Sequence, residues 1–255
     1  MPALLSLVDV TKRYARGSRE VAVLRGASID LNSGDFACVL GGRSEGKTTL
    51  LEIAAGFRRP DGGRVFFAGG DLDGLSERER GRLRRSEIAC VWNRSAPTIH
   101  ARSVLDHVAL PLLSRGEGRW RARRAASGMI DRVGAAGYRD APVPDLSAGE
   151  RTRVALAQAC VRQPRLLIAD ELTDTLNLTE RNSVLGLLQG FAREGVGILM
   201  SAADAHGALG CSRILSLTDG RLVEPELPGV DAPQQAEPGE LLPFRAREHG
   251  GGGAH

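Results

Sequence analysis

The residues with the clearest chemical potential form the octet Gly41–Thr48, which reads Gly-Gly-Arg-Ser-Glu-Gly-Lys-Thr. It fits G-x-x-x-x-G-K-[ST], a loop whose backbone N–H groups cradle nucleotide phosphates. In such a loop Lys47 bridges the β- and γ-phosphates, and the Thr48 hydroxyl holds Mg²⁺. The alternative is a chance glycine-rich turn. The phosphate-binding residues expected here are Gly41, Gly42, Arg43, Ser44, Glu45, Gly46, Lys47, Thr48 and Thr49.

The flanking segments favour the phosphate loop over a chance turn. Residues 35–40 form a short apolar run typical of a buried strand, and residues 48–57 carry apolar residues at helical spacing. A loop between a strand and a helix lets the positive end of the helix dipole face the phosphates.

A second candidate for chemistry is a pair of carboxylates, Asp170 and Glu171, after the apolar run 166–169. The ends of strands are where a doubly wound sheet places its ligand. Asp170 would hold Mg²⁺, directly or through water, and Glu171 would polarise the attacking water as general base.

A third candidate is the start of a helix at residues 146–150, Leu-Ser-Ala-Gly-Glu. Ser147 and Glu150 have the spacing of a capping box. One interpretation is simply a well-capped helix. The functional one is that this helix N-terminus binds a phosphate carried by another subunit.

Composition places these motifs in an ordinary globular protein of 255 residues, with 42% hydrophobic and 25% charged residues. No apolar run approaches the roughly 20 residues that span a bilayer, and residues 1–7 lack the basic region of a signal peptide. We therefore expect a cytoplasmic chain. The net charge of +3 does not argue for nucleic acid, and four well-separated cysteines suggest buried thiols.

The order of elements predicts a three-layer α/β fold. Strands are expected within 4–31, at 87–92, 166–169 and 197–201, with helices at 76–85, 104–113 and 119–133. The arginine runs at 78–85 and 115–124 are either solvated helix faces or contacts with anionic headgroups or an acidic partner loop. The Pro- and Gly-rich segment 225–255 is expected to be disordered.

With its motifs in this order, the chain resembles the nucleotide-binding subunits of ATP-binding cassette (ABC) transporters over residues 4–224. Residues 146–150 resemble the family signature Leu-Ser-Gly-Gly-Gln, so Ser147 and Gly149 are implied to contact nucleotide. Tyr14 matches the aromatic that stacks on adenine; alternatively, it is a core-edge aromatic. Residues 103–113 resemble the branch that serves lipoprotein-release, macrolide-export and cell-division permeases.

The resemblance implies a fold and a mechanism. The fold is a P-loop NTPase core with a mostly parallel sheet, an N-terminal antiparallel portion and an inserted helical subdomain. The implied boundaries are 1–92 and 150–224 for a RecA-like core, and 93–149 for the helical subdomain. Two subunits would sandwich two ATP molecules with Mg²⁺, and their closure would drive permease subunits at the inner face of the membrane.

Several positions depart from the family pattern on the γ-phosphate side. Ala203 stands where the family has its switch histidine, and such a lost donor costs roughly 3–4 kcal/mol of transition-state stabilisation. His206 lies three residues later and is interpreted as a surface residue. Asn93 replaces the glutamine that senses the γ-phosphate and binds the metal, and Asn177 replaces an aspartate.

Other departures lie in the phosphate loop and after the general base. Ser44 replaces a usual glycine and would be strained at positive φ, Glu45 places a carboxylate near the phosphates, and Leu172 replaces a proline. The pattern suggests retained nucleotide binding and weakened hydrolysis; unrelated substitutions in an active enzyme are the alternative.

Three functions compete at this stage. The first is an energy-coupling transporter subunit, paired with a different and more complete nucleotide-binding chain. The second is a non-hydrolysing nucleotide switch that regulates a membrane or cell-wall partner. A soluble ABC ATPase of DNA repair or translation is disfavoured, because the chain has neither a long coiled coil nor a second cassette.

Overall fold

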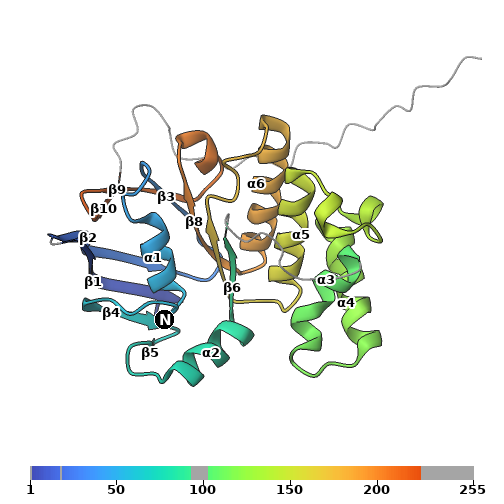
Figure 1. Cartoon of the computed structure of the whole chain (residues 1–255), viewed down its shortest axis with the longest axis horizontal. Coiled ribbons are helices and arrows are strands. Elements are labelled where there is room, and N and C mark those ends of the chain that lie inside the picture. Colours follow the sequence, from blue (N-terminus) through green and yellow to red (C-terminus); the bar gives the residue numbers. More distant parts are fainter. Residues whose placement is uncertain (1, 18, 93–102, 225–255) are drawn as a thin grey trace, which may run out of the picture. The chain divides into compact units, whose positions relative to one another are not determined.

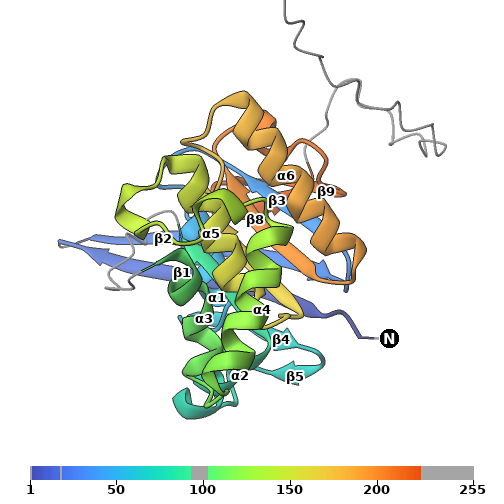
Figure 2. The same ribbon diagram turned by 90° about the vertical axis from the view of Figure 1, so that its right-hand side faces the viewer.

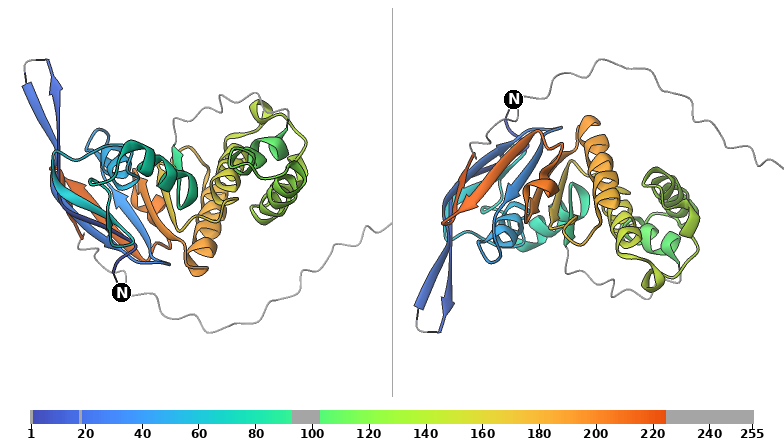
Figure 3. Two further views of the ribbon diagram at one scale, coloured as in Figure 1. Left: turned by 90° about the horizontal axis from the view of Figure 1, so that it is seen from below. Right: turned by 90° about the horizontal axis from the view of Figure 1, so that it is seen from above.

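Two β-sheets organise this computed structural model, which describes residues 2–17, 19–92 and 103–224 (Figure 1). The smaller sheet has four antiparallel strands in the order β2-β1-β4-β5. Its strands are β1 (Leu5–Arg16), β2 (Arg19–Leu31), β4 (Gly62–Phe67) and β5 (Gly70–Asp71). The β1–β2 pair extends well beyond the rest of this sheet (Figure 3).

The larger sheet has six strands in the order β10-β9-β3-β8-β7-β6. All neighbours are parallel except β10, which pairs antiparallel with β9. Its strands are β3 (Phe36–Leu40), β6 (Ile88–Trp92), β7 (Leu166–Asp170), β8 (Gly197–Ala202), β9 (Arg213–Thr218) and β10 (Arg221–Val223). Because the parallel strands share one direction, their carboxyl ends meet at one edge, where any ligand of such a sheet is expected.

Most helices begin at a side chain that caps them. Ser76, Ser103, Ser147 and Asn177 each accept a hydrogen bond from a backbone N–H in the first turn. The helices are α1 (Lys47–Ala54), α2 (Glu77–Ser86), α3 (Val104–Leu113), α4 (Arg119–Arg132), α5 (Ala148–Cys160) and α6 (Leu178–Arg193), with 3₁₀ turns η1 (Ala136–Tyr138), η2 (Val143–Asp145) and η3 (Ala205–Ala208).

The larger sheet is buried on both faces and separates two hydrophobic cores. Along β7, Leu166 and Ile168 face the core shared with α1 and the antiparallel sheet, whereas Leu167 and Ala169 face the core shared with α3 to α6. A strand covered on both sides reads as a continuous apolar run, as this one does. Figure 2 looks onto the helices of the second core.

The α/β fold class with a mostly parallel sheet, an antiparallel portion and inserted helices is confirmed. Helix 104–113 has its expected bounds, but the helix expected to reach residue 57 ends at Ala54. Sequence reasoning missed β4, α6 and β9. The subdomain boundaries stay predictions, and the segment 225–255 lies outside the described residues.

Two further expectations concern the cysteines and the membrane. Cys38 and Cys160 are buried, but Cys90 and Cys211 are partly exposed, so the expectation of buried thiols is wrong for these two. Among residues 2–17, 19–92 and 103–224, no helix combines the length and apolar character needed to cross a bilayer.

Candidate nucleotide-binding site

The loop between β3 and α1 closes around its own lysine. Nζ of Lys47 donates to the carbonyl oxygens of Gly41 at 2.7 Å and Gly42 at 2.9 Å, and only 4% of the side chain is exposed. Gly46 allows this path because its φ is +104°, and a Cβ there would lie 2.5 Å from Val23 Cγ1. The ammonium group is therefore held at the loop before any phosphate arrives.

Helix α1 begins with open donors. Its N-cap is Gly46, which offers no side-chain acceptor, and no acidic residue occupies its first turn. The first-turn N–H groups, which include those of Thr48 and Thr49, therefore keep the positive end of the helix available for an anion. The sequence-predicted phosphate seat fits this geometry. Arg43, also predicted to contribute, is exposed on the loop.

The second half of the site is a hydrogen-bond chain across the sheet edge. Oγ1 of Thr48 donates to Oδ2 of Asp170 at 2.7 Å, and Oγ of Ser201 donates to Oδ1 of the same carboxylate at 2.7 Å. Asp170 is 7% exposed and Ser201 is fully buried. A hydroxyl and a carboxylate facing each other are oxygen ligands of the kind that Mg²⁺ prefers, so the two residues fit the predicted metal site.

Glu171 is held in an unusual backbone conformation beside this chain. Its φ is +48°, which is rare for a residue other than glycine. Its N–H donates to Ser201 Oγ at 3.0 Å, and its Oε1 lies 3.3 Å from Lys47 Nζ. Strain of this kind persists where the surroundings fix it, often at functional sites. The structure thus brings the predicted general base to the predicted phosphate-binding lysine.

The two unusual residues inside the loop behave differently. Ser44 has a φ of +66°, so the left-handed conformation anticipated from the sequence is present. The Glu45 carboxylate turns back into the loop, where Oε2 accepts from the Gly42 N–H at 2.6 Å. A Cβ on Gly41 would lie 2.5 Å from the same oxygen, so a side chain there would displace this carboxylate from its present position. The loop consequently carries its own negative charge.

Ala203, which stands where the family has its switch histidine, lies near Asp174 of the loop that follows β7. Ala203 is exposed just after the end of β8, and its backbone amide lies near the Asp174 carboxylate. Burial raises the pKa of Asp174, and the nearby negative charges of Glu171 and Asp204 raise it further. His206 is exposed, with Nδ1 3.9 Å from Asp204 Oδ1, as expected of a surface histidine.

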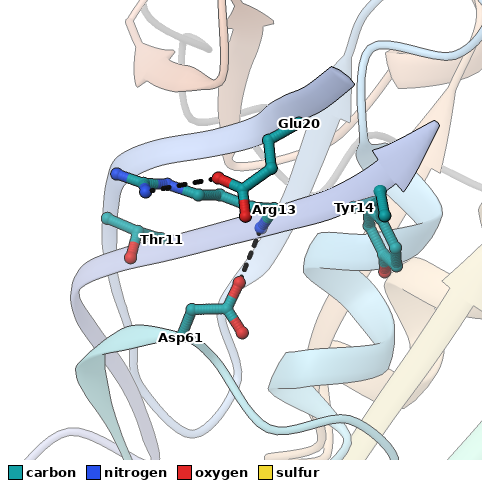
Figure 4. Close-up of a pocket in the computed structure, with 6 residues that line it drawn as sticks. Thr11, Arg13, Tyr14, Glu20 and Asp61 are labelled. Carbon is teal, nitrogen blue, oxygen red and sulfur yellow. Dashed lines mark hydrogen bonds and ion pairs between the residues drawn. The ribbon is translucent and has the colours of Figure 1, made fainter. Parts of the chain in front are cut away.

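Tyr14 lies on β1 at the edge of a cavity of about 530 Å³. Its hydroxyl is 3.3 Å from Thr49 Oγ1, and the Arg58 guanidinium lies 5.4 Å from its ring centroid. Figure 4 shows Tyr14 pointing away from Arg13, Glu20 and Asp61, the polar residues that line the cavity with it. The ring is thus beside the loop rather than in the core.

The signature-like residues lie on a different element, at the start of α5. The capping box expected there is confirmed: Ser147 N–H donates to Glu150 Oε2 at 2.8 Å, and Glu150 N–H donates to Ser147 Oγ at 3.3 Å. Ser147 is exposed, while Gly149 is buried against the Glu180 carboxylate of α6, which leaves no room for a Cβ. Both hydrogen bonds are made within the first turn, and Ser147 remains exposed at the start of the helix.

Sequence reasoning missed two residues of the site, and one prediction lies outside what the structure describes. Ser201 and Glu180 were not singled out; a lone serine in the apolar run 197–202 was the available signal for the first. Asn93 lies outside the described residues, directly after Trp92, whose register partner is Asp170.

Comparison with known proteins assigns this sequence to one family. Residues 24–174 match the family described as ABC transporter. Lipoprotein-releasing system ATP-binding protein LolD 1 of Caulobacter vibrioides is 36% identical over 226 residues, covering 87% of this chain and 95% of the relative. The chain belongs to the ABC transporter family.

This ABC cassette also resembles part of a longer protein. Macrolide export ATP-binding/permease protein MacB of Syntrophobacter fumaroxidans is 34% identical over 249 residues. The match covers 95% of the cassette but 34% of MacB, so the cassette spans about a third of that relative. Among solved structures, the dimeric bacterial ABC transporter cassette MJ0796 has a TM-score of 0.78 and 25% identity, covering 86% of this chain and 96% of that chain.

Proposed function

We propose that this ABC cassette binds Mg-ATP and couples it to membrane permease subunits, as one half of a nucleotide-binding dimer. The observation that carries the proposal is the meeting of Lys47, Thr48 and Asp170 at the carboxyl edge of the larger sheet. These residues supply the charge and the oxygen ligands for a nucleotide and its metal. The similarity to LolD and MacB supports a permease partner.

The residues of the chain have separable roles in this proposal. Lys47 leaves Glu171 and bridges the β- and γ-phosphates, while the open end of α1 donates to them. Thr48 and Asp170 would hold Mg²⁺, with Asn93 proposed as a further ligand, and the metal would neutralise charge on the phosphates. Glu171, freed from Lys47, accepts the proton of the attacking water. Tyr14 provides a ring face for the base.

We further propose that this chain is the weaker half of a heterodimer. Its own site combines Ala203 in place of a histidine with the carboxylates of Glu45 and Asp174. Each of these disfavours developing negative charge on the γ-phosphate. Its signature helix, by contrast, keeps Ser147 and Gly149 at an exposed, capped N-terminus, so it can complete the partner's site.

The first experiment combines binding with partner identification. Isothermal titration calorimetry on the purified chain should show Mg-ATP binding, and pull-down from detergent-solubilised membranes should recover a permease and a second nucleotide-binding chain. Recovery of only this chain would favour a homodimer. The absence of ATP binding, alone and with recovered partners, would falsify the proposal.

A second function is favoured by the same unfavourable charges. If the assembled complex binds ATP but does not turn it over, the chain is a nucleotide-dependent regulator of a membrane or cell-wall partner. Steady-state phosphate release by the complex separates the two functions. Under the transporter function the chain lies at the inner face of the membrane through its permease partner, and neither function involves nucleic acid.

A further inference from the structure

The start of α4 and the turn before it carry a strongly charged surface that the nucleotide site does not use. We call it the arginine–tryptophan patch: Arg115, Arg119, Trp120, Arg121 and Arg124. All five are exposed, and Trp120 is 71% exposed, the highest value among the large hydrophobic residues of the described chain. Glu117 is the only acidic residue in the segment 114–130.

The patch is not used for packing or for ion pairs. Successive residues of a helix are about 100° apart, which places Trp120, Arg121 and Arg124 on one side. The opposite side holds the buried residues Ala122, Ala126 and Ile130. Arg123 points between the two sides and pairs with Asp106. In the described residues, the arginines of the patch itself form no ion pair.

The charges also stand where a helix disfavours them. Helix α4 has Gly118 as N-cap without a side-chain hydrogen bond, and its first turn contains Arg119 and Arg121 but no acidic residue. Cations at the positive end of the helix dipole destabilise the helix. A local conflict of this kind, with no packing gain, is expected where a residue serves binding rather than folding.

The other arginine run, at residues 78–85 on α2, differs from the patch in its capping and in its ion pairs. Helix α2 begins with a complete capping box at Ser76 and has acidic residues in its first turn. Its Glu77 pairs with Arg80 at 2.9 Å and with Arg84 at 2.6 Å. Arg80 and Arg84 thus stabilise their own helix, whereas no arginine of the patch forms an ion pair within the described residues.

We propose that the arginine–tryptophan patch binds the headgroups of an anionic phospholipid bilayer. Guanidinium groups are attracted to a negative membrane surface, and tryptophan, whose indole ring has a polar edge, is enriched at membrane–water interfaces. The Arg124 guanidinium lies 5.4 Å from the Trp120 ring centroid, so the charge and the ring can contact the same surface. Helix α4 lies at the outer edge of the described chain, remote from the smaller sheet (Figures 1 and 3).

This contact is independent of the nucleotide site. It would hold the helical end of the chain against the membrane in addition to any permease contact. A phospholipid surface is favoured over an acidic protein loop because Arg121 and Arg124 share one exposed side of the helix with the indole of Trp120. The small residues Ala125 and Gly128 on the same side let a flat surface approach.

The test is co-sedimentation of the full-length chain with vesicles of phosphatidylcholine alone and of an equal mixture with phosphatidylglycerol. The wild type should partition onto the anionic vesicles only, and less at high salt. The triple variant R119Q/R121Q/R124Q should lose an order of magnitude or more in partition coefficient. The matched control R78Q/R82Q/R85Q removes the same charge from exposed positions of α2 and should change it by less than about twofold.

A second readout reports on the indole itself. Tryptophan emission of the wild type should shift to shorter wavelength on anionic vesicles, and the shift should be absent in Trp120→Phe, which keeps Trp92. ATP affinity serves as the folding control for every variant. No partition of the wild type, or equal losses in both triple variants, would overturn the proposal; binding of the patch to a recovered acidic protein instead would replace the lipid.

Discussion

Nζ of Lys47 lies 3.3 Å from Oε1 of Glu171, so the proposed phosphate-binding lysine and the proposed general base are paired with each other. Lys47 is almost fully buried, whereas about a third of the Glu171 side chain is exposed. A nucleotide phosphate therefore has to replace one carboxylate at a buried ammonium. Under the proposed function, this exchange would release Glu171 when it has to accept a proton from the attacking water.

Replacing the lysine should remove nucleotide binding without unfolding the chain. Lys47→Ala should weaken Mg-ATP binding by about an order of magnitude or more, because it deletes the only cation held inside the loop. Calorimetry measures the affinity. Lys12→Ala, which removes a lysine paired with Asp61 away from the loop, is the control and should leave affinity unchanged. Equal binding by Lys47→Ala and wild type would contradict the assignment of the site.

The carboxylate of Glu45 should oppose the nucleotide. Glu45→Gln keeps an acceptor for the Gly42 N–H but removes a negative charge from the phosphate loop. ATP affinity should rise by about threefold to fivefold, since an exposed charge interaction contributes up to about 1 kcal/mol. The gain should shrink at high ionic strength. Glu117→Gln, an exposed change with the same charge difference, should have no effect; a drop in affinity with Glu45→Gln would show that the carboxylate supports the loop.

Asp174 should make stability depend on pH. Burial raises its pKa, so the folded state binds this proton more tightly than the unfolded state. Its contribution to stability is therefore present at low pH and is lost as pH rises through the folded-state pKa. Asp174→Asn removes the loss, and its Tm should exceed that of wild type near pH 8, with the difference shrinking toward pH 4. The exposed change Asp140→Asn should show no such trend. A destabilised Asp174→Asn at high pH would contradict this.

How far the sequence predicts this site depends on how local each feature is. The loop geometry follows from glycines and a lysine that are neighbours in the chain, so it was predictable. The carboxylates of Asp170 and Glu171 were predictable because strand ends share an edge. The role of Asp174 was not, since it depends on Ala203, which approaches from a different strand. The same holds for Ser201, which joins two residues about thirty positions away.

The contrast between the arginine runs also required three dimensions. Both were expected to be either solvated or binding surfaces, and composition alone does not separate the two. In α2, Glu77 lies one turn from Arg80 and forms ion pairs. In α4, the acidic residue nearest in sequence to Arg119 lies before the helix, and the exposed indole has no apolar cover.

The last prediction tests the proposed asymmetry between two ATP sites in the assembled complex. Glu171→Gln changes only this chain's own site, which lacks the histidine at Ala203, so it should reduce ATP turnover by less than about twofold. Ser147→Arg blocks the exposed start of α5, which is proposed to complete the partner's site, and should nearly abolish turnover. The partner's equivalent of Glu171 should be essential. Steady-state ATPase rates of the three variants decide the matter, with ATP binding of the isolated Ser147→Arg chain as the folding control. Severe and equal losses from both glutamate changes would show two equivalent sites and would remove the ground for a weaker half.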